Sequence, residues 1–221
     1  ESILSATFGS AKYRLGVSGT YPNQDTAEYL TIESLVGPKL VTVGSRELME
    51  KNIISEVKIK SLLLYHNDEH FSDNIKNIKK CGDGKKSYQL EKEYVQSSTL
   101  RKEFVMKLVK RFEQNSLLLF YTIEYGTEIF NYLRDNVVGK DFYYIDGSTS
   151  SEKRTFILKQ MSITTGNIKC LVASFGTLST GISVKPICNI VFLDSFKSDK
   201  IIRQSIGRGL RLHIEKKKLH V

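Results

Sequence analysis

The second half of the chain alternates between two hydrophobic patterns. Residues 100–114 repeat apolar side chains at the period of a helix, and residues 116–121 are apolar almost without interruption, as in a buried strand. The pattern continues with predicted helices over 124–134, 149–161 and 199–212 and predicted strands over 142–145, 168–173 and 187–193. Thr149 and Glu152 have capping-box spacing at the start of the second of these helices. Apolar strands in strict alternation with helices predict an α/β fold, a doubly wound parallel sheet with helices on both faces.

The first part of the chain is less regular. It predicts a short strand over 13–18, a helix over 26–36 and a strand with one polar face over 57–65. Residues 66–87 are polar and rich in lysine, and they predict a flexible loop. Residue 1 is Glu, and residues 2–11 have the pattern of a helix interior, so we expect the chain to be a piece of a longer protein.

The charge balance favours polyanionic partners. Thirty-three Lys and Arg stand against 24 Asp and Glu, which gives a net charge of +9 and a pI near 9.3. Charge alone does not separate nucleic acid from an acidic membrane surface. No stretch approaches the roughly 18 consecutive apolar residues that span a bilayer, and the start lacks signal-peptide features, so we expect a cytoplasmic protein without a membrane partner.

Cysteine and histidine usage predicts no metal site. The three cysteines, Cys81, Cys170 and Cys188, lack C-x-x-C spacing and lie in or near apolar runs, which predicts reduced thiols in the core. His66 and His70 are four residues apart, with no further ligand group at a typical spacing. A solvated loop is the favoured interpretation of that pair.

One motif near the C-terminal end points to phosphate. Gln204, Gly207, Arg208 and Arg211 have the spacing Q-x-x-G-R-x-x-R within a predicted helix, so the glutamine and both arginines are expected on one side of it. The guanidinium group pairs bidentately with phosphate oxygens and keeps its charge. The alternative is a solvated basic helix in which the glutamine and glycine are incidental.

A second candidate segment follows the predicted strand 168–173. Residues 174–183 are a run of hydroxyl side chains and glycines, which suits contacts to nucleic-acid phosphates. Ligands bind at the carboxyl ends of strands in open α/β sheets. The candidate loops are therefore those that follow Tyr121, Ile145, Ala173 and Leu193.

Five segments in order resemble motifs III to VI of superfamily 2 helicases, most closely the UvsW type, whose relatives are the XPB and RecG-type remodelling enzymes. They are 18–20 (SGT), 117–122 (LLLFYT), 144–148 (YIDGS), 173–183 (ASFGTLSTGIS) and 204–211 (QSIGRGLR). The resemblance implies a RecA-like fold in which residues 1–38 are a remnant of the first RecA-like domain, 39–98 connect the domains and contain the loop 66–87, and 99–221 form the second motor domain.

The resemblance also implies roles for single residues. Arg208 and Arg211 would act as arginine fingers on ATP, Gln204 would contact the γ-phosphate or the attacking water, and Gly181 would lie at the nucleotide. The implied contacts to nucleic acid are Thr122, Ser174, Ser179 and Thr180. The implied residues that couple hydrolysis to movement between the domains are Ser18, Gly19 and Thr20. The implied activity is ATP-driven movement on single-stranded or branched DNA in recombination, repair or replication-fork remodelling, in a bacterial or phage-infected cell.

The chain departs from the helicase pattern in its nucleotide motifs. It has no G-x-x-x-x-G-K-[ST] and no D-E-x-H segment, residues 82–87 contain only the end of the former, and Ser183 stands where many relatives have Asp. We therefore expect the ATP and Mg²⁺ ligands in a missing N-terminal RecA-like domain, and negligible hydrolysis by this chain alone. The alternatives are a non-catalytic RecA-like module that binds nucleic acid, the motor of a restriction enzyme, and a nucleotide enzyme that is indifferent to DNA.

Overall fold

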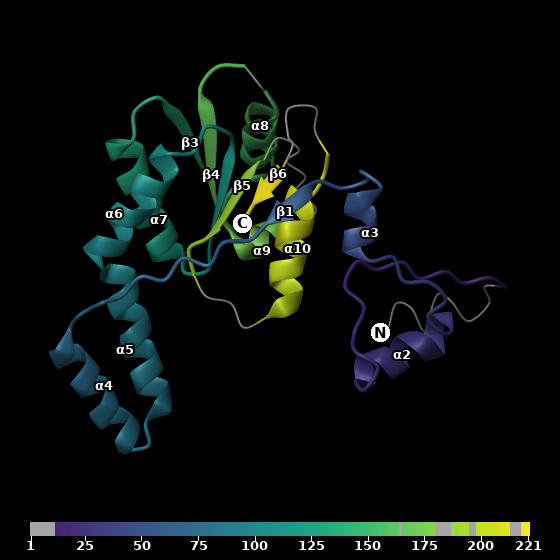
Figure 1. Ribbon diagram of the computed structural model, residues 1–221, viewed down its shortest axis with the longest axis horizontal. Helices are drawn as coiled ribbons and strands as arrows, with labels where there is room; N and C mark the ends of the chain where they lie inside the picture. Colours follow the sequence, from purple (N-terminus) through teal and green to yellow (C-terminus); the bar gives the residue numbers. More distant parts are fainter. Residues whose placement is uncertain (1–11, 164, 180–186, 195–197, 213–217) are drawn as a thin grey trace.

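The strands form one parallel sheet (Figure 1). The computed structural model describes residues 12–163, 165–179, 187–194, 198–212 and 218–221. Within these ranges the strand order is β1-β6-β5-β2-β4-β3, and every recorded strand pair is parallel. The strands are β1 (Glu56–Lys58), β2 (Ser116–Phe120), β3 (Lys140–Ile145), β4 (Ile168–Ser174), β5 (Asn189–Phe192) and β6 (Lys218–His220). The predicted doubly wound parallel sheet is confirmed.

Strand β2 is the centre of the fold. All five of its residues are buried, and its side chains alternate between two hydrophobic cores. Leu118 and Phe120 pack against α6 (Thr99–Lys110) and α7 (Ile123–Asn136) on one face. Leu117 and Leu119 lie in the core of the other face, which is covered by α8 (Ser151–Ser162), α9 (Phe175–Ser179) and α10 (Asp199–Gly209). Helices thus cover both faces, as the apolar strands predict.

Serine side chains set where three of these helices begin. Ser98, Ser150 and Ser198 are the N-caps of α6, α8 and α10, and each side chain accepts a hydrogen bond from a backbone N–H of the first turn. The predicted capping box of Thr149 and Glu152 is wrong, because the N-cap is one residue later and the Thr149 hydroxyl donates to Asp146 instead.

The predicted flexible loop over 66–87 is also wrong. These residues form most of a helical hairpin, α4 (Glu69–Lys80) and α5 (Gly84–Ser97), which extends away from the sheet in Figure 1. Asp68 caps α4, and the rings of Phe71 and Tyr94 stack between the helices with centroids 3.9 Å apart. Lys79 pairs with Glu91 at 2.7 Å, and both are exposed. The high lysine content led to the loop prediction, although a helix pair of this kind needs only a few apolar contacts between its helices.

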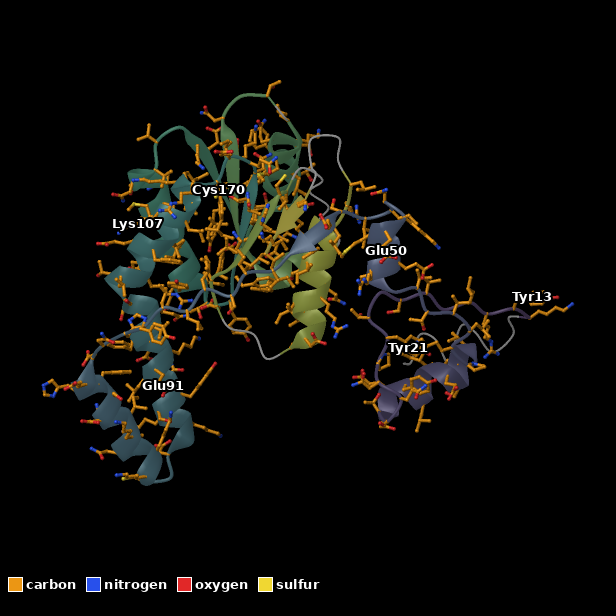
Figure 2. All side chains as sticks on the ribbon, in the orientation of Figure 1. Tyr13, Tyr21, Glu50, Glu91, Lys107 and Cys170 are labelled. Atoms are coloured by element: carbon orange, nitrogen blue, oxygen red, sulfur yellow. The ribbon has the colours of Figure 1, made fainter. Side chains whose placement is uncertain are left out.

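The N-terminal part differs from prediction at its strands. Residues 13–18 form no strand, and Tyr13 is 84% exposed at the end of a segment that projects away from the sheet (Figure 2). The predicted helix over 26–36 is confirmed as α2 (Ala27–Val36), none of whose residues is buried, and a short helix α3 (Ser45–Glu50) follows. Where a strand was predicted over 57–65, the structure has β1 over 56–58 only. The Lys60 N–H still donates to the Val221 carbonyl oxygen at 2.7 Å, and the chain then crosses to α4. Residues 2–11 lie outside the described ranges.

The cysteines correct one further prediction. Cys170 and Cys188 are buried as expected, but Cys81 is exposed at the turn between α4 and α5. None of the three forms a disulfide. Burial raises the pKa of the Cys170 thiol to about 12, so this group stays protonated in the core (Figure 2). Within the described residues no helix combines the length and hydropathy needed to cross a membrane.

Two glycines let helices approach the sheet closely. A Cβ at Gly126 in α7 would lie 2.4 Å from the ring of Phe120, and a Cβ at Gly209 in α10 would lie 2.7 Å from Ile190. A Cβ at Gly207, the glycine of the arginine motif, would meet no atom within 4 Å. Gly209, and not Gly207, therefore lets α10 pack closely on the sheet.

We predict that Ala destabilises the fold at one helical glycine and not at another. Gly126→Ala should lower the free energy of unfolding, because the new methyl overlaps a ring held in the core, at a cost of about 1–3 kcal/mol for overpacking. Gly207→Ala is the matched control and should leave stability unchanged or raise it by about 0.5–1 kcal/mol, the helix propensity of Ala over Gly. Urea unfolding measures both, and a stabilising Gly126→Ala would contradict the packing described here.

Candidate nucleotide and nucleic-acid site

Polar residues gather where the parallel strands end. Thr122, Asp146 and Asp194 follow β2, β3 and β5, and Ser174 is the last residue of β4. Because all the strand pairs are parallel, these carboxyl ends share one edge of the sheet. Strand β2 is also where the strand order changes direction, with β4 and β3 on one side and β5 and β6 on the other. Such switch points are where open α/β sheets bind ligands.

Asp194 ties the ends of two strands to the helical hairpin. Its Oδ2 accepts hydrogen bonds from the backbone N–H of Tyr121 at 2.7 Å and of Thr122 at 3.5 Å. Gln96, at the end of α5, donates from Nε2 to Asp194 Oδ1 at 3.0 Å and to Thr122 Oγ1 at 3.1 Å. The structure thus places the predicted contact residue Thr122 in a network of three side chains.

Sequence reasoning missed two members of this network. Asp194 directly follows the predicted strand 187–193, so its position at a strand end was an available signal. Gln96 lies in α5, close to the stretch that the sequence predicted to be a loop, and no pattern in the sequence links it to Thr122. Only the folded hairpin brings the two together.

Asp146 organises the turn after β3. Its Oδ1 accepts four hydrogen bonds, from the backbone N–H and hydroxyl groups of both Ser148 and Thr149, at 2.7–3.0 Å. Burial opposes the charged form, but the bonds from Ser148 and Thr149 outweigh it and hold the pKa of Asp146 below its ordinary value. Arg154 donates to the carbonyl oxygens of Asp146 and Thr149 at 3.4 and 3.2 Å. This turn is therefore held rigidly at the site edge.

The segment after β4 is described only in part. Ser174 is half-buried, and its hydroxyl forms a hydrogen bond with the hydroxyl of Thr177 in α9. Ser179 ends α9, and its side chain lies outside the described part. Thr180, Gly181 and Ser183 lie outside it as well. The expected roles of these residues therefore stay predictions.

Helix α10 brings the arginine motif to the N-terminal segment. Gln204 is exposed and donates from Nε2 to Thr20 Oγ1 at 3.4 Å, across 184 positions of sequence. The Ser18 hydroxyl accepts a hydrogen bond from the Thr20 N–H at 3.2 Å, which shapes the turn around Gly19. The structure thus joins two segments that sequence reasoning placed in one mechanism, the predicted coupling residues and the predicted γ-phosphate contact.

The expected alignment of the motif on one helical side is wrong for Arg211. Helix α10 ends at Gly209, and Arg211 lies exposed in the bend that follows. The backbone of Arg208 is helical, and its side chain lies outside the described part. On the same helix, Arg203 pairs with Asp199 at 2.7 Å on the exposed surface.

The described residues contain no group of three or more His, Cys, Asp or Glu side chains that could hold a metal ion. The His66 ring packs edge-on against Tyr94, with centroids 5.6 Å apart. Gln204 and Arg211 offer amide and guanidinium donors, which suit phosphate oxygens and not a cation.

Comparison with known proteins gives the family. Residues 100–213 match the family described as "Helicase conserved C-terminal domain". The chain belongs to this helicase family. The match begins in α6 and extends past the arginine motif, so it includes the whole site edge formed by β2, β3, β4 and β5. The helicase C-terminal domain therefore has the RecA-like sheet that the strand pattern and the resemblance predict.

Two phage comparisons agree with this assignment. The ATP-dependent DNA helicase UvsW of Enterobacteria phage T4 is 30% identical over 216 residues, which are 96% of this chain and 40% of that protein. The crystal structure of T4 UvsW has a TM-score of 0.58 at 28% identity, over 76% of this chain and 32% of that one. The predicted membership of superfamily 2 is confirmed, and the chain spans less than half of the relative's length.

A third comparison concerns the fold alone. The ATP-dependent Type ISP restriction-modification enzyme LlaBIII, solved bound to DNA, has a TM-score of 0.58 at 16% identity. The match covers 85% of this chain and 13% of that enzyme. The same sheet thus serves as one part of a much longer protein.

The Asp146 turn predicts a pH-dependent contribution to stability. Because its folded-state pKa is lowered, the carboxylate stabilises the fold above its ordinary pKa, near 3.8, and this contribution is lost as pH falls through the folded value. Asp146→Asn should therefore be less stable than wild type at about pH 7, with a smaller difference at about pH 3. Urea unfolding at both pH values measures the difference. An equal difference at the two would contradict a charged Asp146 in the turn.

Proposed function

We propose that this chain is the C-terminal motor half of an ATP-dependent DNA helicase or translocase. The observation that carries the proposal is the contact between Gln204 and Thr20, in a member of the helicase C-terminal family. In the proposed motor, Thr20 belongs to the segment that leaves the first RecA-like domain, and Gln204 belongs to the helix that faces the nucleotide. Their contact is a direct physical route between ATP and the relative position of the two domains.

The nucleotide would lie between α10 and a first RecA-like domain that carries the β/γ-phosphate and Mg²⁺ ligands. Arg208 and Arg211 would supply positive charge to the phosphates, Gln204 would orient the γ-phosphate or the attacking water, and Gly181 would line the site. Positive charge placed where the transition state gains negative charge is the main contribution of a protein to phosphoryl transfer. ATP supplies the free energy of its hydrolysis. We propose that this chain alone hydrolyses it negligibly.

The nucleic acid would run along the carboxyl edge of the sheet. Thr122, Ser174, Ser179 and Thr180 would contact the phosphates of one strand of single-stranded or branched DNA. Hydroxyl groups are suited to this because phosphate oxygens are acceptors, and such contacts fix register without reading sequence. The net charge of +9 raises the rate of encounter with DNA. Closing and opening of the cleft by ATP would then move these contacts along the strand, in recombination, repair or fork remodelling.

The proposed test is DNA-stimulated ATP hydrolysis by the whole protein that contains this chain. Arg208→Ala should lower the DNA-stimulated kcat by about 10³–10⁵-fold, the usual effect of an arginine finger. Arg203→Ala is the matched control on the same helix, because Arg203 is exposed and pairs only with Asp199 among the described side chains. The control should retain activity. DNA binding by both variants, measured by fluorescence anisotropy, should equal that of wild type.

The same experiment separates the alternatives. Hydrolysis that is insensitive to DNA would contradict the motor and support a nucleotide enzyme without a nucleic-acid partner. DNA binding without any hydrolysis would support a non-catalytic binding module. Equal activity of the Arg208 and Arg203 variants would contradict the arginine-finger assignment.

A further inference from the structure

We propose that Tyr121 and Thr122 form a one-nucleotide subsite in which the Tyr121 ring stacks on an unpaired base and the Thr122 hydroxyl contacts the neighbouring phosphate. Gln96 and Asp194 are the positioning residues of this subsite. The inference rests on the proposed function and deepens it, since it selects single-stranded nucleic acid as the ligand of this edge.

The Tyr121 ring is exposed but its backbone is fixed. Tyr121 directly follows Phe120 in the sequence. Phe120 is fully buried, whereas Tyr121 is 68% exposed. The Tyr121 N–H donates to Asp194 Oδ2 at 2.7 Å, which anchors the start of the loop to the end of β5. A large aromatic surface is thus presented at the ligand-binding edge from a rigid strand end. Such a surface loses little conformational entropy on binding.

Positive charge lies over one face of the ring, so a base would stack on the opposite face. The ammonium group of Lys92, on α5, is 5.9 Å from the centroid of the Tyr121 ring. An aromatic ring with a neighbouring cation matches both parts of a nucleotide, the base and its phosphate. The Lys92 stem comes from the helical hairpin, so the hairpin forms one wall of the subsite.

The hydrogen bond that Thr122 accepts leaves its hydroxyl hydrogen available as a donor. Thr122 is the N-cap residue of α7, but its side chain makes no capping bond. Its Oγ1 instead accepts from Gln96 Nε2 at 3.1 Å, which leaves the hydroxyl hydrogen to donate to another group. Phosphate oxygens accept hydrogen bonds and do not donate them, so a hydroxyl that donates is suited to a phosphate. Gln96 also donates to Asp194, and one amide therefore orients both the hydroxyl and the carboxylate that anchors Tyr121.

The geometry favours a single strand over a duplex. Stacking on a side chain requires a base whose face is uncovered, and in a duplex the faces are covered by neighbouring base pairs. Every base has such a face, so the subsite should be indifferent to sequence, as a translocating motor requires.

The chain contains no tryptophan, which gives a direct test. Tyr121→Trp would be the only tryptophan, and its emission should be quenched when a single-stranded oligothymidylate binds, with the same midpoint as fluorescence anisotropy. The matched control is Phe156→Trp, which replaces a residue 58% exposed on α8, a helix that packs on the opposite face from α6 and α7. Its emission should not change. A duplex of equal length should quench Tyr121→Trp less than the single strand does.

Affinities of substituted chains test the chemistry of the subsite. Tyr121→Ala should weaken binding of the oligothymidylate by about 5- to 150-fold, the usual effect of removing one stacked base contact, while Tyr121→Phe should retain affinity. Gln96→Ala should weaken binding by a smaller factor in a Thr122→Ala background than in the wild-type background, because part of its effect passes through that hydroxyl and the rest through Asp194. A purely structural role of Gln96 would weaken both backgrounds equally.

The outcomes distinguish this inference from the proposed function. Binding seen by anisotropy without quenching of Tyr121→Trp would overturn the stacking subsite and leave the DNA-binding edge intact. Equal quenching of both tryptophans, or loss of affinity in Tyr121→Phe, would also overturn it. Absence of any binding to single-stranded DNA at low salt would overturn both the subsite and the proposed interface.

Discussion

Burial of strand β2 on both faces is the constraint on which the rest of the structure depends. Its five residues are all buried, and strands β4 and β5 pair with it on either side. Because neither face can meet water, helices must cover both, which accounts for α6 and α7 on one side and α8 to α10 on the other. The parallel pairing places the carboxyl ends of the strands together, and the proposed binding edge follows from that arrangement.

The same constraint explains how distant segments meet at the edge. Asp194 can bond to the backbone of Tyr121 because β5 lies beside β2. Gln96 reaches them because a single residue, the shared cap Ser98, separates the end of α5 from the start of α6. Hydrogen bonds from Gln96 therefore connect the hairpin directly to this edge of the sheet. We infer that a shift of the hairpin would change the position of the Thr122 hydroxyl. Gln204 and Thr20 would provide the corresponding link on the nucleotide side.

Sequence patterns predicted the parts of the fold that are hydrophobic and repetitive. Strands β2 to β5 lie in apolar runs, and the helices α6, α7, α8 and α10 that cover them were predicted, so the sheet and the family resemblance were accessible from sequence. Helix α9 was not predicted, because its residues belong to the run of hydroxyl side chains and glycines. The α4–α5 hairpin was not, because its stability comes from caps at Asp68 and Asp83 and a few contacts such as Phe71 with Tyr94. The strand at 13–18 was wrong because an alternating pattern forms a strand only where a partner edge exists. Gln96 could not be predicted, since its role depends entirely on tertiary contacts.

The central claim is that nucleotide and DNA act on one another through this domain. Its most direct test is the equilibrium affinity of the whole protein for single-stranded DNA, with and without a non-hydrolysable ATP analogue. Linkage requires that a motor with alternating grip bind DNA with different affinity in the two states, by about 5- to 150-fold for a typical coupling free energy. Equal affinities would contradict the account and leave a DNA-binding module with no coupling to ATP.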